Sequence, residues 1–288
     1  NPCAEYVHLD DSACNLASVN LLKFLGASDD ETEAIGGFDI DGFCHAIEVV
    51  FTAQEILVGN ADYPTEAIGQ TTRAFRQLGL GYANLGALLM ALGLPYDSDD
   101  GRAVAAALTS LMTGHAYRTS ARLADRMGAF EGFEHNREPM LGVLDMHREA
   151  VELLDAEVAP AVVAAGRTAW FEACALAQRV GVRNSQATVL APTGTIGLLM
   201  DCDTTGIEPD LSLVKHKRLV GGGTMSIVNR TVPRALRRLG YDDEAVGAIL
   251  AWVDEHQTVV GCPDLRAGHM AVFATSMGDN TIHHTGHI

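Results

Sequence analysis

Long segments with helical periodicity are the feature that most constrains the fold of this chain. Apolar residues recur at helical spacing over residues 41–58. Residues 99–127, with the Asp99–Asp100 cap at their start, and residues 161–180 are two further long segments that we expect to be helical. Pro160 precedes the last of these and Gly181 follows it, which is the usual asymmetry of helix ends. The sequence therefore predicts at least three long helices.

Shorter segments complete the prediction. Residues 78–94 are apolar and rich in Gly and Ala, and we expect a closely packed helix there. Residues 187–190 form a short, partly β-branched run before Pro192, as in a buried strand. Residues 232–239 and 244–256 predict two more helices. Long helices with short strands between them indicate an α/β fold rather than an all-β fold or a simple bundle.

Composition sets the class of protein. The chain has 288 residues, is 48% hydrophobic and shows no repeat or linker, so we expect one domain over residues 1–288. A net charge of −17 disfavours nucleic-acid partners. No run approaches the roughly 18 apolar residues of a membrane span, and no secretory signal is apparent, so we expect no membrane partner and a cytoplasmic location. Because the chain opens with Asn1 rather than Met, we expect a fragment.

The six cysteines do not indicate a disulfide scaffold, because such scaffolds belong to short secreted domains. They are Cys3, Cys14, Cys44, Cys174, Cys202 and Cys262, and no pair has the CxxC spacing of a redox or zinc motif. We expect Cys44, Cys174 and Cys202 to be packing residues, the usual fate of a free cysteine.

The first candidate site is the opening segment. In an extended chain Asn1, Cys3 and Glu5 point to one side, because their spacing is two. An amide, a thiol and a carboxylate would then share one space and could bind, react and move a proton. By spacing alone this is weak evidence, and a polar loop at a chain end with an incidental cysteine explains the segment better.

Two further candidates follow. Cys14 lies eleven positions after Cys3, and the alternative for it is a small buried side chain. The residues Thr193, Gly194, Thr195 and Ile196 follow a predicted strand. Their backbone N–H groups could bind an anion if a helix starts there, although no lysine follows as in a Walker motif, and an ordinary turn is the alternative.

Five ordered blocks carry a resemblance to a known family. They are residues 1–5, 14–21, 79–86, 191–197 and 201–209. In order and spacing they resemble consecutive blocks of the cobalamin-dependent (class II) ribonucleotide reductases, and the likeness covers nearly the whole chain.

The resemblance implies a fold and an activity. The fold would be a helix-rich part of the ten-stranded α/β barrel of the ribonucleotide reductase and glycyl-radical enzyme type, truncated at both ends. The intact enzyme would reduce ribonucleoside diphosphates to 2′-deoxyribonucleoside diphosphates by thiyl-radical chemistry. Its cofactor would be adenosylcobalamin, its reductant a dithiol or a thioredoxin-like protein, and it could form a homodimer. We expect the fragment alone to be inactive.

The resemblance also implies roles for the opening segment. Cys3 resembles the cysteine that becomes a thiyl radical and takes the 3′-hydrogen of the ribose. Glu5 resembles the carboxylate that removes the 3′-hydroxyl proton. Asn1 resembles the amide that holds the ribose hydroxyls.

The remaining candidates also receive roles from the resemblance. Cys14 resembles one of two cysteines that supply reducing equivalents and end as a disulfide, and its partner would lie upstream of this chain. Thr193, Gly194, Thr195 and Ile196 resemble the loop that receives the substrate phosphates.

Alternatives stay open. The oxygen-dependent di-iron reductases share the Asn-x-Cys-x-Glu arrangement, although the blocks at 79–86 and 192–196 favour the cobalamin type. A non-enzymatic product of a truncated gene is the second alternative. His283, His284 and His287 suggest a metal site, but we expect none there. We expect Gly221–Gly223 to form a turn.

Overall fold

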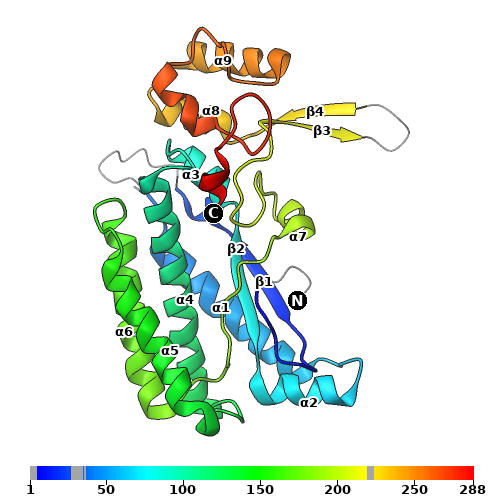
Figure 1. Cartoon of the computed structure of the whole chain (residues 1–288), viewed down its shortest axis with the longest axis vertical. Helices are drawn as coiled ribbons and strands as arrows, with labels where there is room; N and C mark the ends of the chain where they lie inside the picture. The colour runs from blue at the N-terminus through cyan, green and yellow to red at the C-terminus, as the bar shows by residue number, and fades with distance from the viewer. Residues whose placement is uncertain (1–4, 27–34, 36, 219–223) are drawn as a thin grey trace. The chain divides into compact units, whose positions relative to one another are not determined.

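The computed structural model describes residues 5–26, 35, 37–218 and 224–288 (Figure 1). They group into two compact units. Unit 1 comprises Asn1–Val19, Phe38–Tyr82 and Ala105–Ala191, and unit 2 comprises Asn20–Gly37, Ala83–Val104 and Pro192–Ile288. Both units mix helices with short strands, so the predicted helix-rich α/β class is confirmed. Asn1, Cys3 and the Gly221–Gly223 turn lie outside the described residues.

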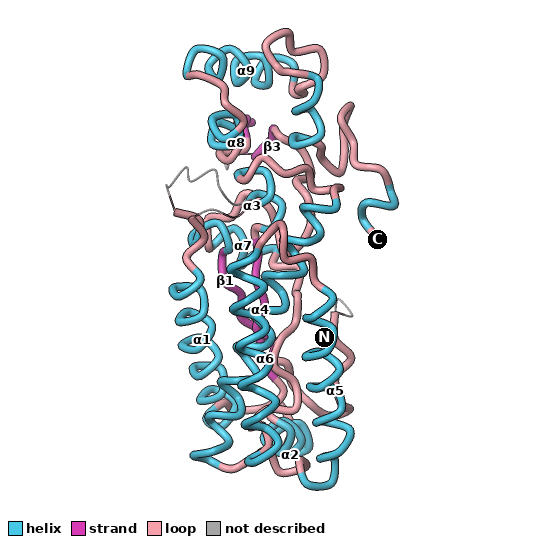
Figure 2. Tube along the Cα trace, turned by 90° about the vertical axis from the view of Figure 1, so that its left-hand side faces the viewer, coloured by secondary structure: helices cyan, strands magenta, loops and turns pink. Residues whose placement is uncertain are grey.

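Long helices make up most of unit 1. They are α1 (Ile40–Asn60), α2 (Glu66–Phe75), α4 (Asp99–Met127, in unit 1 from residue 105), α5 (Arg137–Ala150) and α6 (Pro160–Val180). The helices predicted at 41–58, 99–127 and 161–180 are therefore confirmed. In Figure 2, α4, α5 and α6 run alongside one another. Trp170 of α6 joins two of them, because its indole N–H donates to the Ser110 carbonyl of α4 at 3.1 Å.

Among the described residues, α1 is the one helix that is long and apolar enough to cross a membrane by length and composition alone. Of the residues in its most apolar 18-residue stretch, 33% are buried. Core helices of soluble proteins pass the same test. Phe43, Ile47 and Phe51 of α1 are fully buried, and its Glu55 forms a buried ion pair with Arg76 at 2.6 Å. We therefore assign α1 to the core of unit 1.

A two-stranded sheet pairs β1 (Asn15–Asn20) with β2 (Leu78–Ala83). The extended chain at 186–189 lies along β2 and forms a parallel bridge between Leu80 and Thr188. The Leu80 N–H donates to the Ala187 carbonyl at 3.1 Å, and the Val189 N–H donates to the Leu80 carbonyl at 3.0 Å. The strand predicted at 187–190 is thus confirmed only in part, because these residues pair with β2 through one isolated bridge and form no regular strand.

The helix predicted over residues 78–94 is wrong in its first half. Residues 78–83 form β2, and only α3 (Leu85–Ala91) is helical. The reason is close backbone approach, because a Cβ on Gly81 would lie 2.3 Å from the Val189 carbonyl oxygen. A glycine at this position lets the neighbouring chain pair with β2, and helical periodicity alone does not reveal that neighbour.

Unit 2 is built around shorter elements. They are α3, α7 (Gly194–Leu199), the antiparallel hairpin of β3 (Val214–Arg218) and β4 (Thr224–Val228), α8 (Val232–Arg238) and α9 (Asp243–His256). The predictions at 232–239 and 244–256 are confirmed. The core of this unit includes Val232, Leu236, Ile249, Val253 and Phe273, all buried. Helix α9 begins where the Asp242 side chain accepts from the Ala245 N–H at 2.9 Å, a regular helix cap.

Five short 3₁₀ segments occur among the described residues: η1 (Leu21–Phe24), η2 (Glu134–Asn136), η3 (Val151–Leu153), η4 (Ala267–Phe273) and η5 (His284–His287). The strands of the described residues form two two-stranded sheets, which do not close a barrel. The count of ten strands stays a prediction.

Candidate active site

The predicted site residues divide between the two units. Glu5 and Cys14 lie in unit 1, and Thr193 to Ile196 lie in unit 2. Asn1 and Cys3 fall outside the described residues. Each group is described within its own unit.

Glu5 lines a cavity of about 320 Å³ in unit 1. The other walls come from α4, from residues 186–190 and from His147 of α5. The Oε2 atom of Glu5 is buried and has no hydrogen-bond partner among the described residues. An unpaired buried carboxylate oxygen is costly unless an occupant donates to it. Glu5 is therefore arranged to accept a hydrogen bond or a proton from a group inside this cavity.

The cavity wall is mainly apolar, and its polar groups besides Glu5 include the Thr113 and Thr188 hydroxyls and the Gln186 amide. The hydroxyls of Thr113 and Thr188 lie 3.1 Å apart, and the Gln186 amide donates to the Thr188 carbonyl at 2.7 Å. The His147 ring stacks on the Trp170 ring with centroids 5.2 Å apart. Burial lowers the pKa of His147, so this side chain is neutral near pH 7. Such a wall can hydrogen-bond a polyhydroxylated ligand. Sequence reasoning missed these residues because they come from different elements and share no local motif.

Cys14 lies directly before β1, and bonds on both sides of it fix its backbone. The Ala13 N–H donates to the Thr72 hydroxyl at 2.9 Å, and the Gln54 amide donates to the Asn15 carbonyl at 2.8 Å. Burial raises the pKa of the Cys14 thiol to about 11, and the nearby Glu5 carboxylate adds to the rise. Cys14 is therefore a thiol at neutral pH, and its oxidation to a disulfide must include loss of its proton.

Three polar side chains of unit 1 interact with one another near Cys14. The Gln77 amide donates to the Tyr6 hydroxyl at 2.6 Å. The His8 ring meets the Tyr6 ring edge-on, with ring centroids 4.8 Å apart. Burial lowers the pKa of His8, and a hydrogen bond with the Gln77 side chain opposes that effect.

The predicted phosphate loop, residues 193–196, leads into the short helix α7. Thr193 is buried with a left-handed φ of 52°, and its hydroxyl accepts from the Gly206 N–H at 2.6 Å. Helix α7 begins at Gly194, and Gly194, Thr195 and Ile196 are exposed. The N–H groups of this first turn have no acceptor within the helix. A Cβ on Gly194 would meet no atom within 4 Å, so a ligand could reach the backbone there.

Asn84, from the block at 79–86, binds the block at 201–209 within unit 2. Its Oδ1 accepts from the N–H groups of Asp203 at 3.0 Å and Thr204 at 2.9 Å. The Thr204 hydroxyl in turn accepts from the Ala87 N–H at 3.1 Å, at the start of α3. A Cβ on Gly86 would lie 2.7 Å from the Glu208 carbonyl oxygen. Residues 84–87 are therefore packed closely against residues 203–208 within unit 2.

No three His, Cys, Asp or Glu side chains of the described residues come together to hold a metal ion. His283 and His284 contact each other with ring centroids 4.0 Å apart.

Comparison with known proteins agrees with the sequence blocks. The model of the family "Ribonucleotide reductase, barrel domain" matches residues 1–288. A Vitamin B12-dependent ribonucleotide reductase of Streptomyces coelicolor is 52% identical over 292 residues, covering 100% of this chain and 30% of the relative. One of Streptantibioticus cattleyicolor is 53% identical over 290 residues, covering 98% of this chain and 48% of the relative.

A more distant relative is the Vitamin B12-dependent ribonucleoside-diphosphate reductase of Mycobacterium tuberculosis. It is 30% identical over 277 residues, covering 96% of this chain and 32% of the relative. The chain thus spans between 30% and 48% of the length of these three relatives.

Proposed function

This chain belongs to the ribonucleotide reductase family through its barrel domain, and we propose that the protein of which it is part reduces ribonucleoside diphosphates to 2′-deoxyribonucleoside diphosphates with a B12 cofactor. The family match over all 288 residues carries this proposal. The diphosphate is supported by the name of the Mycobacterium tuberculosis relative.

Glu5 is the residue whose described geometry best supports the chemistry. A base must accept the 3′-hydroxyl proton of the ribose while the 2′-hydroxyl leaves as water. Glu5 has a buried oxygen without a described partner, and it lines a cavity whose mainly apolar wall also carries the Thr113 and Thr188 hydroxyls. In this proposal Cys3 takes the 3′-hydrogen as a thiyl radical, and Asn1 holds the ribose hydroxyls.

Cys14 supplies electrons rather than a radical. The thiols of Cys14 and of a second cysteine of the protein lose two protons and two electrons and form a disulfide. The 2′-carbon gains a hydrogen in place of its hydroxyl, which leaves as water. An external dithiol or a thioredoxin-like protein then reduces the disulfide by exchange. The thiol form of Cys14 at neutral pH suits this role, because the proton stays on sulfur until oxidation.

The substrate phosphates bind at the start of α7. The exposed first turn at Gly194, Thr195 and Ile196 presents unpaired N–H groups to an anion. Thr193 holds this turn against Gly206 through its hydroxyl. The backbone thus positions the diphosphate without a lysine from the loop itself.

Adenosylcobalamin is the proposed form of the cofactor, and it supplies the radical that this chain's residues use. The names of the relatives support B12 dependence over the di-iron alternative. We further propose that these strands belong to a ten-stranded barrel, that the enzyme acts in the cytoplasm, where thiols stay reduced, and that it forms a homodimer.

A single-turnover assay of the full-length protein tests the assignment. Cys3→Ser should abolish both 3′-hydrogen exchange and deoxyribonucleotide formation while nucleotide binding persists. Cys14→Ser should still allow 3′-hydrogen abstraction, but reduction at the 2′-carbon should fail and free base should be released. Normal turnover by Cys3→Ser would overturn the proposal. Normal deoxyribonucleotide formation by Cys14→Ser would make Cys14 a packing residue.

A further inference from the structure

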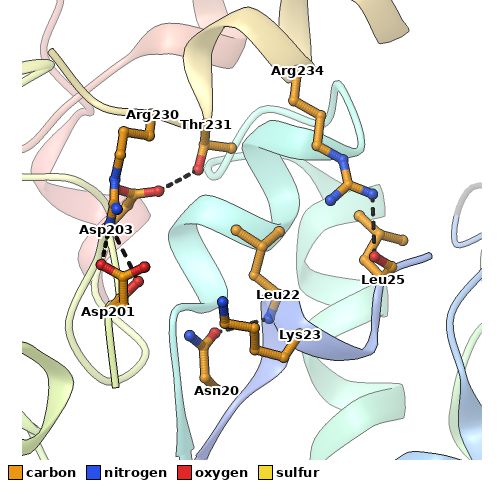
Figure 3. Close-up of a pocket in the computed structure, with 9 residues that line it drawn as sticks. All are labelled: Asn20, Leu22, Lys23, Leu25, Asp201, Asp203, Arg230, Thr231 and Arg234. Atoms are coloured by element: carbon orange, nitrogen blue, oxygen red, sulfur yellow. Dashed lines mark hydrogen bonds and ion pairs between the residues drawn. The ribbon is translucent and has the colours of Figure 1, made fainter. Parts of the chain in front are cut away.

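A cavity of about 420 Å³ lies in unit 2, and none of the roles proposed above uses it. Three segments far apart in sequence line it: residues 20–25, residues 201–203 after α7, and residues 230–234 at the start of α8 (Figure 3). Its volume lies within the roughly 300–1,000 Å³ of small-molecule sites. It is large enough for more than a single inorganic ion.

The charge of this cavity is opposite to that of the chain. Lys23, Arg230 and Arg234 line it together with Asp201 and Asp203, which leaves one net positive charge. The whole chain carries 20 basic and 37 acidic residues. Three cations at one cavity therefore form a local site for an anion, against a surface that otherwise repels one.

One wall of the cavity is held by a connected set of polar side chains. Arg230 Nη2 lies 2.7 Å from Asp201 Oδ1, and Arg230 Nε lies 3.4 Å from Asp203 Oδ1. The Thr231 hydroxyl donates to Asp203 Oδ2 at 2.7 Å. The Arg230 and Asp201 side chains are 56% and 61% exposed, so solvent screens their pairing. Arg230 can turn to a phosphate at small cost, because an arginine–phosphate pair is bidentate and strong.

The other two cations approach from different directions. Arg234 Nη2 donates to the Gly26 carbonyl at 2.5 Å and to the Leu25 carbonyl at 3.3 Å, which holds its guanidinium at the cavity (Figure 3). The Lys23 side chain forms no hydrogen bond or ion pair with any residue that the structure describes. Arg230 lowers the pKa of Asp201, and Lys23 adds a smaller effect in the same direction, so the Lys23 ammonium acts on this wall.

We propose that this cavity binds a ribose phosphate. The phosphate contacts Lys23 and the Arg230 and Arg234 guanidiniums, and the ribose hydroxyls donate to the carboxylates of Asp201 and Asp203. Cations alone would suit any anion, but carboxylates at the same cavity select a ligand that also carries hydroxyl donors. A sugar phosphate has both groups within one small molecule.

Two sources could supply this chemistry. One is a free nucleotide such as ADP. The other is the ribose phosphate in the nucleotide tail of a cobalamin, and only this second source rests on the proposed function. The shared group predicts the same contacts in both cases, so the experiment includes both ligands.

Hydrogen exchange followed by mass spectrometry tests the proposal on the full-length protein, because it reports on each segment without turnover. The probes are ADP and cyanocobalamin, each added at saturating concentration. We expect slower exchange at 20–26 and 229–236 with at least one of them. Protection by ADP alone identifies a free nucleotide, and protection by cyanocobalamin alone identifies the cofactor tail. Absence of protection by both ligands would overturn the proposal.

Charge reversal at Lys23 identifies the contact. Lys23→Glu should raise the ligand concentration for half-maximal protection at least tenfold, while Lys23→Arg should retain binding. Arg102→Glu is the matched control, because Arg102 is a 57% exposed arginine of unit 2 that lies outside the cavity. Lys23 is exposed, so Lys23→Glu should keep the Tm of the parent. Unchanged protection in Lys23→Glu would refute the proposed contact.

The same data separate this inference from the proposed function. Protection of residues 193–199 by ADP reports on the proposed substrate phosphate site. If that segment is protected while both cavity segments stay unprotected, the inference fails and the proposed function stands. If only the cavity segments are protected, the phosphate role of α7 fails and the inference stands.

Discussion

Asn84 Nδ2 donates to Asn20 Oδ1 at 2.9 Å, and both side chains are buried. Asn84 has a left-handed φ of 74°, which asparagine tolerates better than most residues. The Asn20 side chain forms a further hydrogen bond, in which its Nδ2 donates to the Met200 carbonyl at 3.1 Å. This pair of amides connects the start of α3 to the segment after α7, within unit 2.

Replacing Asn84 should destabilise the protein strongly. Asn84→Ala removes the acceptor of two N–H groups, at Asp203 and Thr204, and leaves both without this partner. We expect a loss of about 2–5 kcal/mol in the free energy of unfolding, measured with urea. Asn84→Gly should recover about 1 kcal/mol of this, because glycine adopts the left-handed conformation without strain. Asn60→Ala, at an exposed helix end, is the control and should cost under about 0.5 kcal/mol.

Gly81 should tolerate no side chain. The Cβ of Gly81→Ala would lie 2.3 Å from the Val189 carbonyl oxygen, which is backbone and cannot move aside without disturbing its pairing with β2. We expect Gly81→Ala to lower the free energy of unfolding by about 1–3 kcal/mol. Gly247→Ala is the matched control, because Gly247 lies inside α9 with no atom within 4 Å of an added Cβ. That change should instead stabilise by about 0.5–1 kcal/mol, and equal effects of the two would disprove the steric explanation.

Glu55 should be among the most sensitive side chains in unit 1. It lies 2.6 Å from Arg76 and 2.7 Å from Arg183, and it accepts from the Asn184 amide at 2.7 Å. Glu55→Ala leaves two arginines without their carboxylate. Because these groups are largely buried, we expect a loss of about 3–5 kcal/mol by thermal or urea unfolding. Glu66→Ala, at an exposed position, should change stability by under about 0.5 kcal/mol, and a similar value at Glu55 would contradict the role of the cluster.

Gly194→Val should weaken substrate binding without affecting the fold. A Cβ added at Gly194 meets no atom within 4 Å outside its chain neighbours and its own helix backbone, so the Tm should stay within a few degrees of the parent. The β-branched side chain would crowd the backbone donors of α7 and raise the KM for the nucleoside diphosphate at least tenfold. Steady-state kinetics on the full-length protein measure this, with Gly247→Val as a control for glycine replacement. An unchanged KM would indicate an ordinary turn at residues 193–196.

Cys14 should react slowly with alkylating reagents at neutral pH. Its pKa of about 11 lies about two units above the ordinary value of 9.0, so the reactive thiolate is about 100-fold rarer at pH 8. The rate of iodoacetamide labelling at Cys14, followed by mass spectrometry, should rise about tenfold per pH unit and level off only near pH 11. The urea-unfolded chain is the control, in which labelling should level off near pH 9. A plateau near pH 9 in the folded protein would contradict the burial of this thiol.

Local periodicity in the sequence was enough to predict the long helices and the α/β class. The segments at 99–127, 161–180, 232–239 and 244–256 all proved helical within about a residue, because an apolar stripe at helical spacing is a property of one segment alone. The five blocks also identified the family, which the match over residues 1–288 confirmed.

Other features depended on neighbours that no local pattern reveals. Residues 78–83 form a strand because residues 186–189 pair with them. Gly81 permits the close approach of Val189, and the sequence around Gly81 does not reveal that neighbour. The hydrogen-bond partners of Asn84 are residue 20 and residues 203–204. The ion-pair and hydrogen-bond partners of Glu55 are residue 76 and residues 183–184. Polar side chains are satisfied by whatever backbone or charge the fold brings beside them. The sequence alone therefore determined which segments are helical and which family they belong to, whereas only the tertiary structure decided which polar groups meet and which cavities they line.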